Sequence, residues 1–72
     1  MNKILQQIEE DSGVKTSLQE KAREVLFYWK KLNKVEKEDF KSLVEHHFKN
    51  YSIKYRPTDS GQELLLSYSK KG

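Results

Sequence analysis

The chain has 72 residues, no cysteine and a formal net charge of +3, with hydrophobic and charged residues at 35% each. A chain of this length forms one domain with a small core, because it buries only about 60% of the surface that its unfolded form exposes. The lack of cysteine excludes disulfide cross-links and thiolate metal sites and favours a reducing, cytoplasmic location. No apolar run reaches the length that spans a bilayer, so we expect no membrane partner.

The first predicted element is a short helix over residues 3–11. Ile4, Leu5 and Ile8 form one apolar stripe at helical spacing. Ser12-Gly13 ends the helix, since glycine is common directly after the last turn. The stripe must be buried against another part of the chain.

A second, longer helix is predicted over residues 17–32. Ser17-Leu18-Gln19-Glu20 has the spacing of a capping box, in which the serine hydroxyl and the glutamate carboxylate each satisfy a free backbone N–H. At helical periodicity, one apolar arc of about 120° forms the predicted core face. Its members are Leu18, Ala22, Val25, Leu26, Trp29 and Leu32.

The third predicted helix covers residues 35–49. It follows Asn33-Lys34-Val35-Glu36, a connection that also fits a weaker capping box. Phe40, Val44 and Phe48 lie on its apolar face. Two helices of similar length joined by a short loop are expected to pack as an antiparallel αα-hairpin.

The last predicted element is a β-hairpin over residues 51–69, with strands near 51–56 and 62–69. Both runs alternate between apolar and polar residues, and Pro57-Thr58-Asp59-Ser60-Gly61 supplies the turn between them. Tyr51, Ile53 and Tyr55 share one side of the first strand, and Leu64, Leu66 and Tyr68 face the same side from the second.

These elements predict an α+β fold of a single domain: three helices with an αα-hairpin core, followed by a C-terminal β-hairpin. The helical part covers residues 1–50, the hairpin 51–69 and a loose tail 70–72. The order of elements resembles that of a winged-helix DNA-binding domain, in which the third helix enters the major groove and the hairpin forms the wing.

No motif in the chain points to catalysis. There is no glycine-rich phosphate loop, no metalloprotease motif and no nucleophile elbow. His46 and His47 are adjacent, so on a helix their side chains diverge by about 100° and do not converge on one metal ion. We therefore predict a protein that is not an enzyme and that uses no metal and no cofactor.

Phe27 is the most informative single residue, because it falls on the polar face of the predicted second helix. One interpretation is that the first helix covers it. The other is that Phe27 is exposed and, together with Tyr28, forms an aromatic and basic patch beside Arg23, Lys30 and Lys31. Such a patch suits a protein interface and equally suits stacking on unpaired bases.

Positive charge accumulates after residue 20, since residues 1–20 carry a net −2 and the remainder +5. A basic run crosses the connection between the second and third predicted helices and is expected to contact phosphate groups. It consists of Lys30, Lys31, Lys34, Lys37 and Lys41. The predicted binding residues are Arg23, Phe27, Lys30, Lys31, Lys34, Lys41, Lys54 and Arg56.

The first predicted function is that of a small, basic, cytoplasmic domain that binds nucleic acid, DNA above all, in a regulatory role. The alternative is a protein–protein interaction module, such as a regulator, inhibitor or assembly factor of a bacterium or its phage. That module would act through the aromatic and basic patch and the free edge of the hairpin. The small core also favours homodimer formation.

Overall fold

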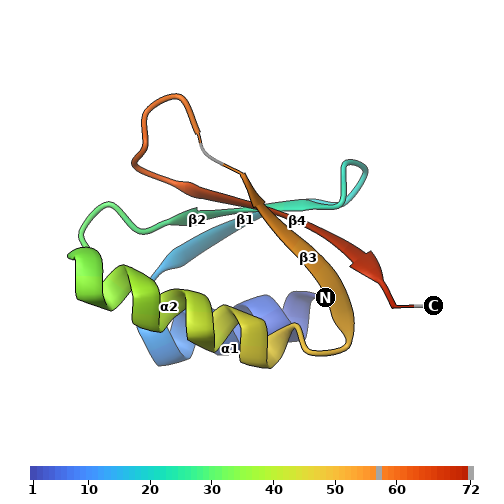
Figure 1. The fold of residues 1–72 in the computed structure, drawn as a ribbon. Helices are drawn as coiled ribbons and strands as arrows, with labels where there is room; N and C mark the ends of the chain where they lie inside the picture. The colour runs from blue at the N-terminus through green and yellow to red at the C-terminus, as the bar shows by residue number, and fades with distance from the viewer. Residues whose placement is uncertain (57, 72) are drawn as a thin grey trace.

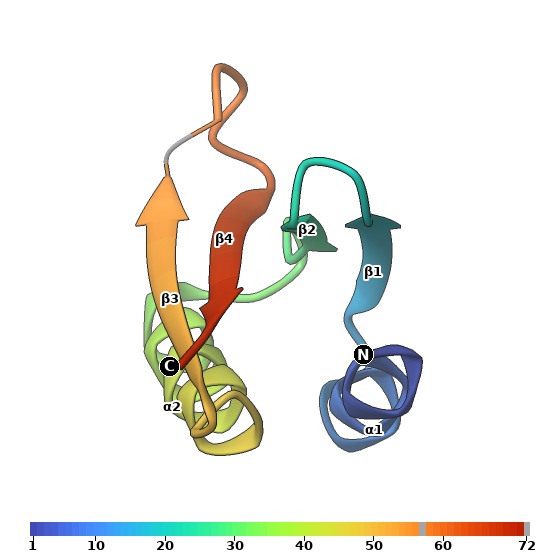
Figure 2. The same cartoon turned by 90° about the vertical axis from the view of Figure 1, so that its right-hand side faces the viewer.

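The computed structural model describes residues 1–56 and 58–71, which form two helices and a four-stranded antiparallel sheet. The strand order is β1-β2-β4-β3. Both helices lie on one face of the sheet, and no described element covers the other face, which we call the open face (Figures 1 and 2). In chain order the elements are α1 (Asn2–Ser12), β1 (Lys15–Gln19), β2 (Glu24–Tyr28), α2 (Lys34–His47), β3 (Tyr51–Arg56) and β4 (Leu64–Lys70).

The prediction of three helices followed by a hairpin is wrong, and so is the winged-helix arrangement that was inferred from it. Residues 17–32 form no helix; they contain most of β1, a turn, β2 and an irregular connection. In β2, Val25 and Phe27 are buried while Leu26 and Tyr28 are not, which is the alternation of a strand. Hydrogen bonding of β2 between β1 and β4 outweighs the helical propensity of this segment.

The turn between β1 and β2 explains why the apparent capping box is not one. Ser17 lies in β1, where it pairs with Leu26, and Glu20 begins the turn. The Arg23 N–H donates to the Glu20 carbonyl at 3.2 Å, and Arg23 has a φ of 54°, in the left-handed region. The Arg23 carbonyl in turn accepts from the Tyr68 N–H at 3.0 Å, which ties the turn to β4.

The other predicted elements form near their expected positions, as α1, α2 and the β3–β4 pair. The second predicted capping box is confirmed: the Glu36 N–H donates to Asn33 Oδ1 at 2.8 Å, and the Asn33 N–H donates to Glu36 Oε1 at 2.9 Å. Ile53 pairs with Tyr68, so the two strands face the same side as predicted. Pro57 of the predicted turn and Gly72 of the predicted tail lie outside the described residues.

The core lies between the sheet and the two helices. The Phe27 ring packs edge to face on Phe40 of α2, with centroids 5.1 Å apart, and Trp29 approaches the same Phe40 ring at 6.0 Å. The buried apolar residues are Leu5, Ile8, Val14, Val25, Phe27, Trp29, Phe40, Val44, Phe48, Leu64 and Leu66. The apolar stripe of α1 is therefore covered by the same core as the sheet.

Across the described residues, neither helix has both the length and the apolar character needed to cross a membrane.

Candidate functional site

Phe27 is fully buried, with 0% of the residue exposed, so it cannot contact a ligand at the surface. Its neighbour Tyr28 is 44% exposed and faces the open side of the sheet. The idea of an exposed Phe27 anchor is therefore wrong. Of these two adjacent aromatic residues, Tyr28 is the one that a ligand can reach.

The predicted basic residues do not form one continuous patch. The sheet separates them, because Lys54 and Arg56 of β3 lie on the open face, whereas Lys34 and Lys41 lie on α2 at the other face. Their positions are Arg23 in the β1–β2 turn, Lys30 and Lys31 directly after β2, Lys34 and Lys41 on α2, and Lys54 and Arg56 on β3.

The open face combines an apolar centre with polar and cationic borders. Leu26 of β2 and Leu65 of β4 pair directly at its centre. Arg56 lies beside Leu65 on the outer strand β3, and Ser17 lies beside Leu26 on the outer strand β1. The next row across the sheet consists of Lys54, Ser67, Glu24 and Gln19.

A hollow of about 420 Å³ lies where the open face meets the β2–α2 connection. Tyr28 contributes its ring, and Lys15 is its cross-strand partner on β1. Three lysines and no carboxylate line this hollow. We call it the Tyr28 hollow; its residues are Gly13, Lys15, Tyr28, Lys30 and Lys31.

A second concentration of cations lies over Trp29, on the helix side of the sheet. The Nζ atoms of Lys37 and Lys41 lie 5.3 and 5.8 Å from the Trp29 ring centroid. Lys41 Nζ is also 5.4 Å from the Tyr55 ring, within the range of cation–π attraction. We call these four residues the Trp29 cluster.

Two shallow hollows flank the Trp29 cluster, and Trp29 and Lys41 line both of them. One, of about 380 Å³, is also lined by Lys34, Lys37 and Glu38. The other, of about 330 Å³, extends toward Arg56 and the β3–β4 loop. Lys34 and Lys41 are thus brought together around an aromatic residue that the sequence had suggested only as core.

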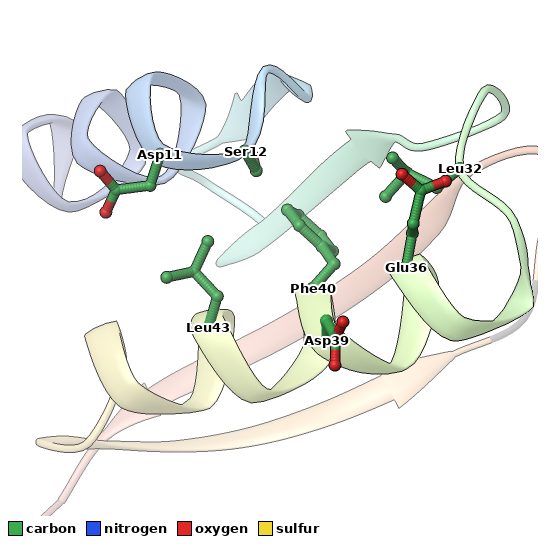
Figure 3. A pocket seen from close by; sticks show the side chains of 7 residues that line it. All are labelled: Asp11, Ser12, Leu32, Glu36, Asp39, Phe40 and Leu43. Carbon is green, nitrogen blue, oxygen red and sulfur yellow. The ribbon is translucent and has the colours of Figure 1, made fainter.

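A third depression, of about 210 Å³, lies between α1 and α2. Figure 3 shows Phe40 and Leu43 pointing from α2 toward α1. Two of the three carboxylates that line this depression serve the fold itself: Asp11 lies 3.3 Å from His47 Nε2, and Glu36 takes part in the capping box of α2. Because Phe40 and Leu43 fill the space between the helices and two of the carboxylates are engaged, we assign the groove to helix packing.

Charge is unequally divided between the two layers. With histidines neutral, α1 and α2 carry seven carboxylates and four lysines, a net −3, whereas the four strands carry four cations and one carboxylate, a net +3. An anionic helix layer repels phosphate, and a cationic sheet attracts it. The sheet and its connections are the electrostatically favourable side for a polyanion, and on α2 the favourable part is the face that carries Lys34, Lys37 and Lys41.

Tyr55, a member of the Trp29 cluster, has a raised pKa. Burial, and secondarily the nearby Glu45 carboxylate, raises the pKa of Tyr55 from 10.0 to about 12. Its hydroxyl donates to the Lys41 carbonyl at 3.3 Å. The unfolded chain therefore ionises Tyr55 at a lower pH than the folded chain does, so the stability linked to neutral Tyr55 is complete below pH 10 and is lost between pH 10 and 12.

We predict that Tyr55→Phe reduces the loss of folding stability at alkaline pH. Since solvent screens a partly exposed group, the difference in unfolding free energy between pH 9 and pH 12 should shrink by about 1 kcal/mol in the variant. Urea unfolding of both proteins across this range measures it. Lysine titration is common to both proteins and cancels in the comparison, so parallel pH profiles would contradict the assignment.

Sequence reasoning missed Lys15 and the surface role of Trp29, whereas Tyr28 and Lys37 were both expected at the surface. Lys15 joins the hollow only because β1 pairs with β2, which the predicted helix excluded. Lys37 was expected in the basic run but not among the binding residues; it lies one helical turn before Lys41 on α2.

Comparison with protein-family models, with curated proteins and with solved structures finds no match for this chain.

Proposed function

We propose that this domain binds nucleic acid in an unpaired form, with the Tyr28 hollow as its principal contact. The observation that carries the proposal is the exposed Tyr28 ring among three lysines, in a hollow with no carboxylate in its lining. Proteins that bind single strands combine aromatic stacking platforms with cationic grooves. Insertion of α2 into a duplex groove is not part of the proposal, since the carboxylates of that helix outnumber its lysines by four to three.

The chemistry assigns separate tasks to the ring and to the lysines. A base stacks on Tyr28, and the ammonium groups of Lys30 and Lys31 pair with the flanking phosphates. Lys54 and Arg56 extend the cationic surface to the far side of the open face. Leu26 and Leu65 provide an apolar floor between these two cations and the Tyr28 hollow. Stacking is tolerant of base identity, so affinity is expected to depend little on sequence.

We also propose that the domain is a cytoplasmic, non-catalytic protein with a regulatory role. This part rests on the composition of the chain, its lack of cysteine and its lack of catalytic motifs.

We predict that Tyr28→Ala weakens binding of a fluorescently labelled oligothymidylate by about 5- to 150-fold, the effect of losing one base-stacking contact. Fluorescence anisotropy at 50 mM salt measures the affinity. Tyr28→Phe is the matched control, because it keeps the ring and should keep the affinity. Equal affinities for all three proteins, or no binding by the parent chain, would contradict the proposal.

A protein partner is the second candidate function, favoured by the edges of the sheet. Strands β1 and β3 are each paired on one side only, so both present unpaired backbone groups along an outer edge. A second copy of the chain is the simplest strand to add there. Analytical ultracentrifugation over a range of protein concentrations tests this, and a monomer throughout would argue against homodimer formation.

A further inference from the structure

We infer that the Trp29 cluster is a second nucleotide contact, in which a phosphate draws Lys37 and Lys41 away from the indole and a base takes their place on its face. This inference rests on the proposed function and extends it to the helix side of the sheet. It assigns the same ligand class to residues that the Tyr28 hollow does not include.

The first argument is the arrangement of the two lysines. Both ammonium groups lie within 6 Å of the Trp29 ring. Among the described residues the only ion pair joins His47 and Asp11, so neither lysine is held by a carboxylate. Cation–π contacts at accessible sites are weak, and an oxyanion that pairs with both ammonium groups competes well against them.

The second argument is the indole itself. Trp29 is only 8% exposed, and its Nε1 is the one buried side-chain nitrogen or oxygen of the described residues without a hydrogen-bond partner. An unpaired buried N–H is a cost to the free protein that a phenylalanine at this position would not carry. The cluster thus uses a tryptophan, the best aromatic partner for cations and a strong stacking surface, where packing alone favours an apolar ring.

The third argument is access. Hollows open on both sides of Lys41, and Trp29 lines both. The side chains of Lys37 and Lys41 are partly exposed, so they can swing into solvent without disturbing the core. Once they move, the indole is exposed at the wall of these hollows.

The Trp29 cluster adjoins the Tyr28 hollow, so a single-stranded nucleic acid can contact both. Tyr28 and Trp29 are consecutive residues at the end of β2, the first on the open face and the second on the helix side. Lys30 and Lys31 follow in the connection between β2 and α2 (Figure 1), and Lys34 is the first residue of α2. A single-stranded nucleic acid that passes around this end of the sheet meets one aromatic residue on each face of the sheet and lysines between the two.

Trp29 is the only tryptophan of the chain, so its fluorescence reports on this cluster alone. The full chain is titrated with unlabelled oligothymidylate while anisotropy of a labelled copy follows total binding. We expect Trp29 emission to be quenched along the same saturation curve. Unchanged emission at saturation overturns the inference and leaves the proposed function intact, whereas absence of any binding overturns both.

Titration with inorganic phosphate separates a nucleotide from a free oxyanion. Phosphate displaces the lysines but supplies no base, so it should change the emission less than the oligonucleotide does at equal phosphate concentration. An equal change for both ligands would show that the cluster takes only the oxyanion, and the stacking part of the inference would be wrong.

The double variant Lys37→Gln/Lys41→Gln tests the two lysines directly. It should lower the log–log salt slope of oligonucleotide binding by about 1.4, at about 0.7 per phosphate contact on a single strand. In the free protein, acrylamide should quench Trp29 more strongly, since shorter side chains cover the ring. Lys3→Gln/Lys49→Gln removes the same charge from exposed sites elsewhere and is the control. Equal slopes for the two double variants would overturn the inference, with thermal melting verifying that both are folded.

Discussion

Phe27→Ala should destabilise the domain by about 3–5 kcal/mol, the range for truncating a large aromatic side chain in a core. Phe27 is fully buried on β2, one of the two inner strands, and packs edge to face against Phe40. The truncation removes this contact and leaves a cavity under the helix layer. Small domains have only about 5–15 kcal/mol of total stability, so the variant is expected to be largely unfolded near 37 °C.

Thermal melting followed by circular dichroism measures this effect, and Tyr28→Ala is its internal control. The control removes a comparable ring from the adjacent position, but on the exposed side of the same strand. Its unfolding free energy should change by much less, within about 1 kcal/mol. If residues 17–32 were a helix with Phe27 on its polar face, Phe27→Ala would leave the melting temperature almost unchanged, and that outcome would contradict the sheet.

The parts of the fold that were predictable are those encoded by neighbouring residues. Asn33 and Glu36 form their capping box over three residues, and the hydrogen bonds that define it need nothing else from the chain. The alternation in β3 and β4 is equally local, since the turn that joins them brings the two strands together.

The β1–β2 hairpin was not predictable in the same way. Val25, Leu26 and Trp29 satisfy helical spacing, and Glu20 to Glu24 is a run of good helix formers. Five-residue strands are too short for alternation to outweigh that pattern. What decides the structure is the pairing of β2 with β4, as in Val25 with Leu66, and local sequence does not reveal a partner so far along the chain.

The candidate site was predicted by residue type and not by grouping. An aromatic and basic patch around residues 27–31 was expected with both Phe27 and Tyr28 in it, and the strand leaves only Tyr28 there because adjacent residues face opposite sides. Because residues 24–28 form a strand and not a helix, β2 pairs with β1, and this pairing brings Lys15 beside Tyr28. It also leaves Arg23 in the turn at the end of β2 opposite to the hollow.

Replacing Lys15, Lys30 and Lys31 together by glutamine should have the largest effect on binding. Each phosphate contact with a single strand contributes about 0.7 to the slope of log affinity against log salt, so the triple variant should lose about 2 from that slope. If the triple variant and the parent chain bind equally at 1 M salt, this slope difference makes the variant's affinity for oligothymidylate about a hundredfold lower than the parent's at 0.1 M salt. Anisotropy titrations between 0.05 and about 0.3 M salt measure both quantities.

The matched control is the triple variant Lys3→Gln/Lys21→Gln/Lys49→Gln, which removes the same charge from three exposed positions outside the hollow. If phosphates are held at the Tyr28 hollow, the control keeps most of the slope, because counterions are released only where phosphates are neutralised. Equal losses in the two triple variants would mean that the strand responds to the net charge of the whole domain. The hollow would then have no special part in binding, and the exposed Tyr28 ring would be left without a nucleic-acid role.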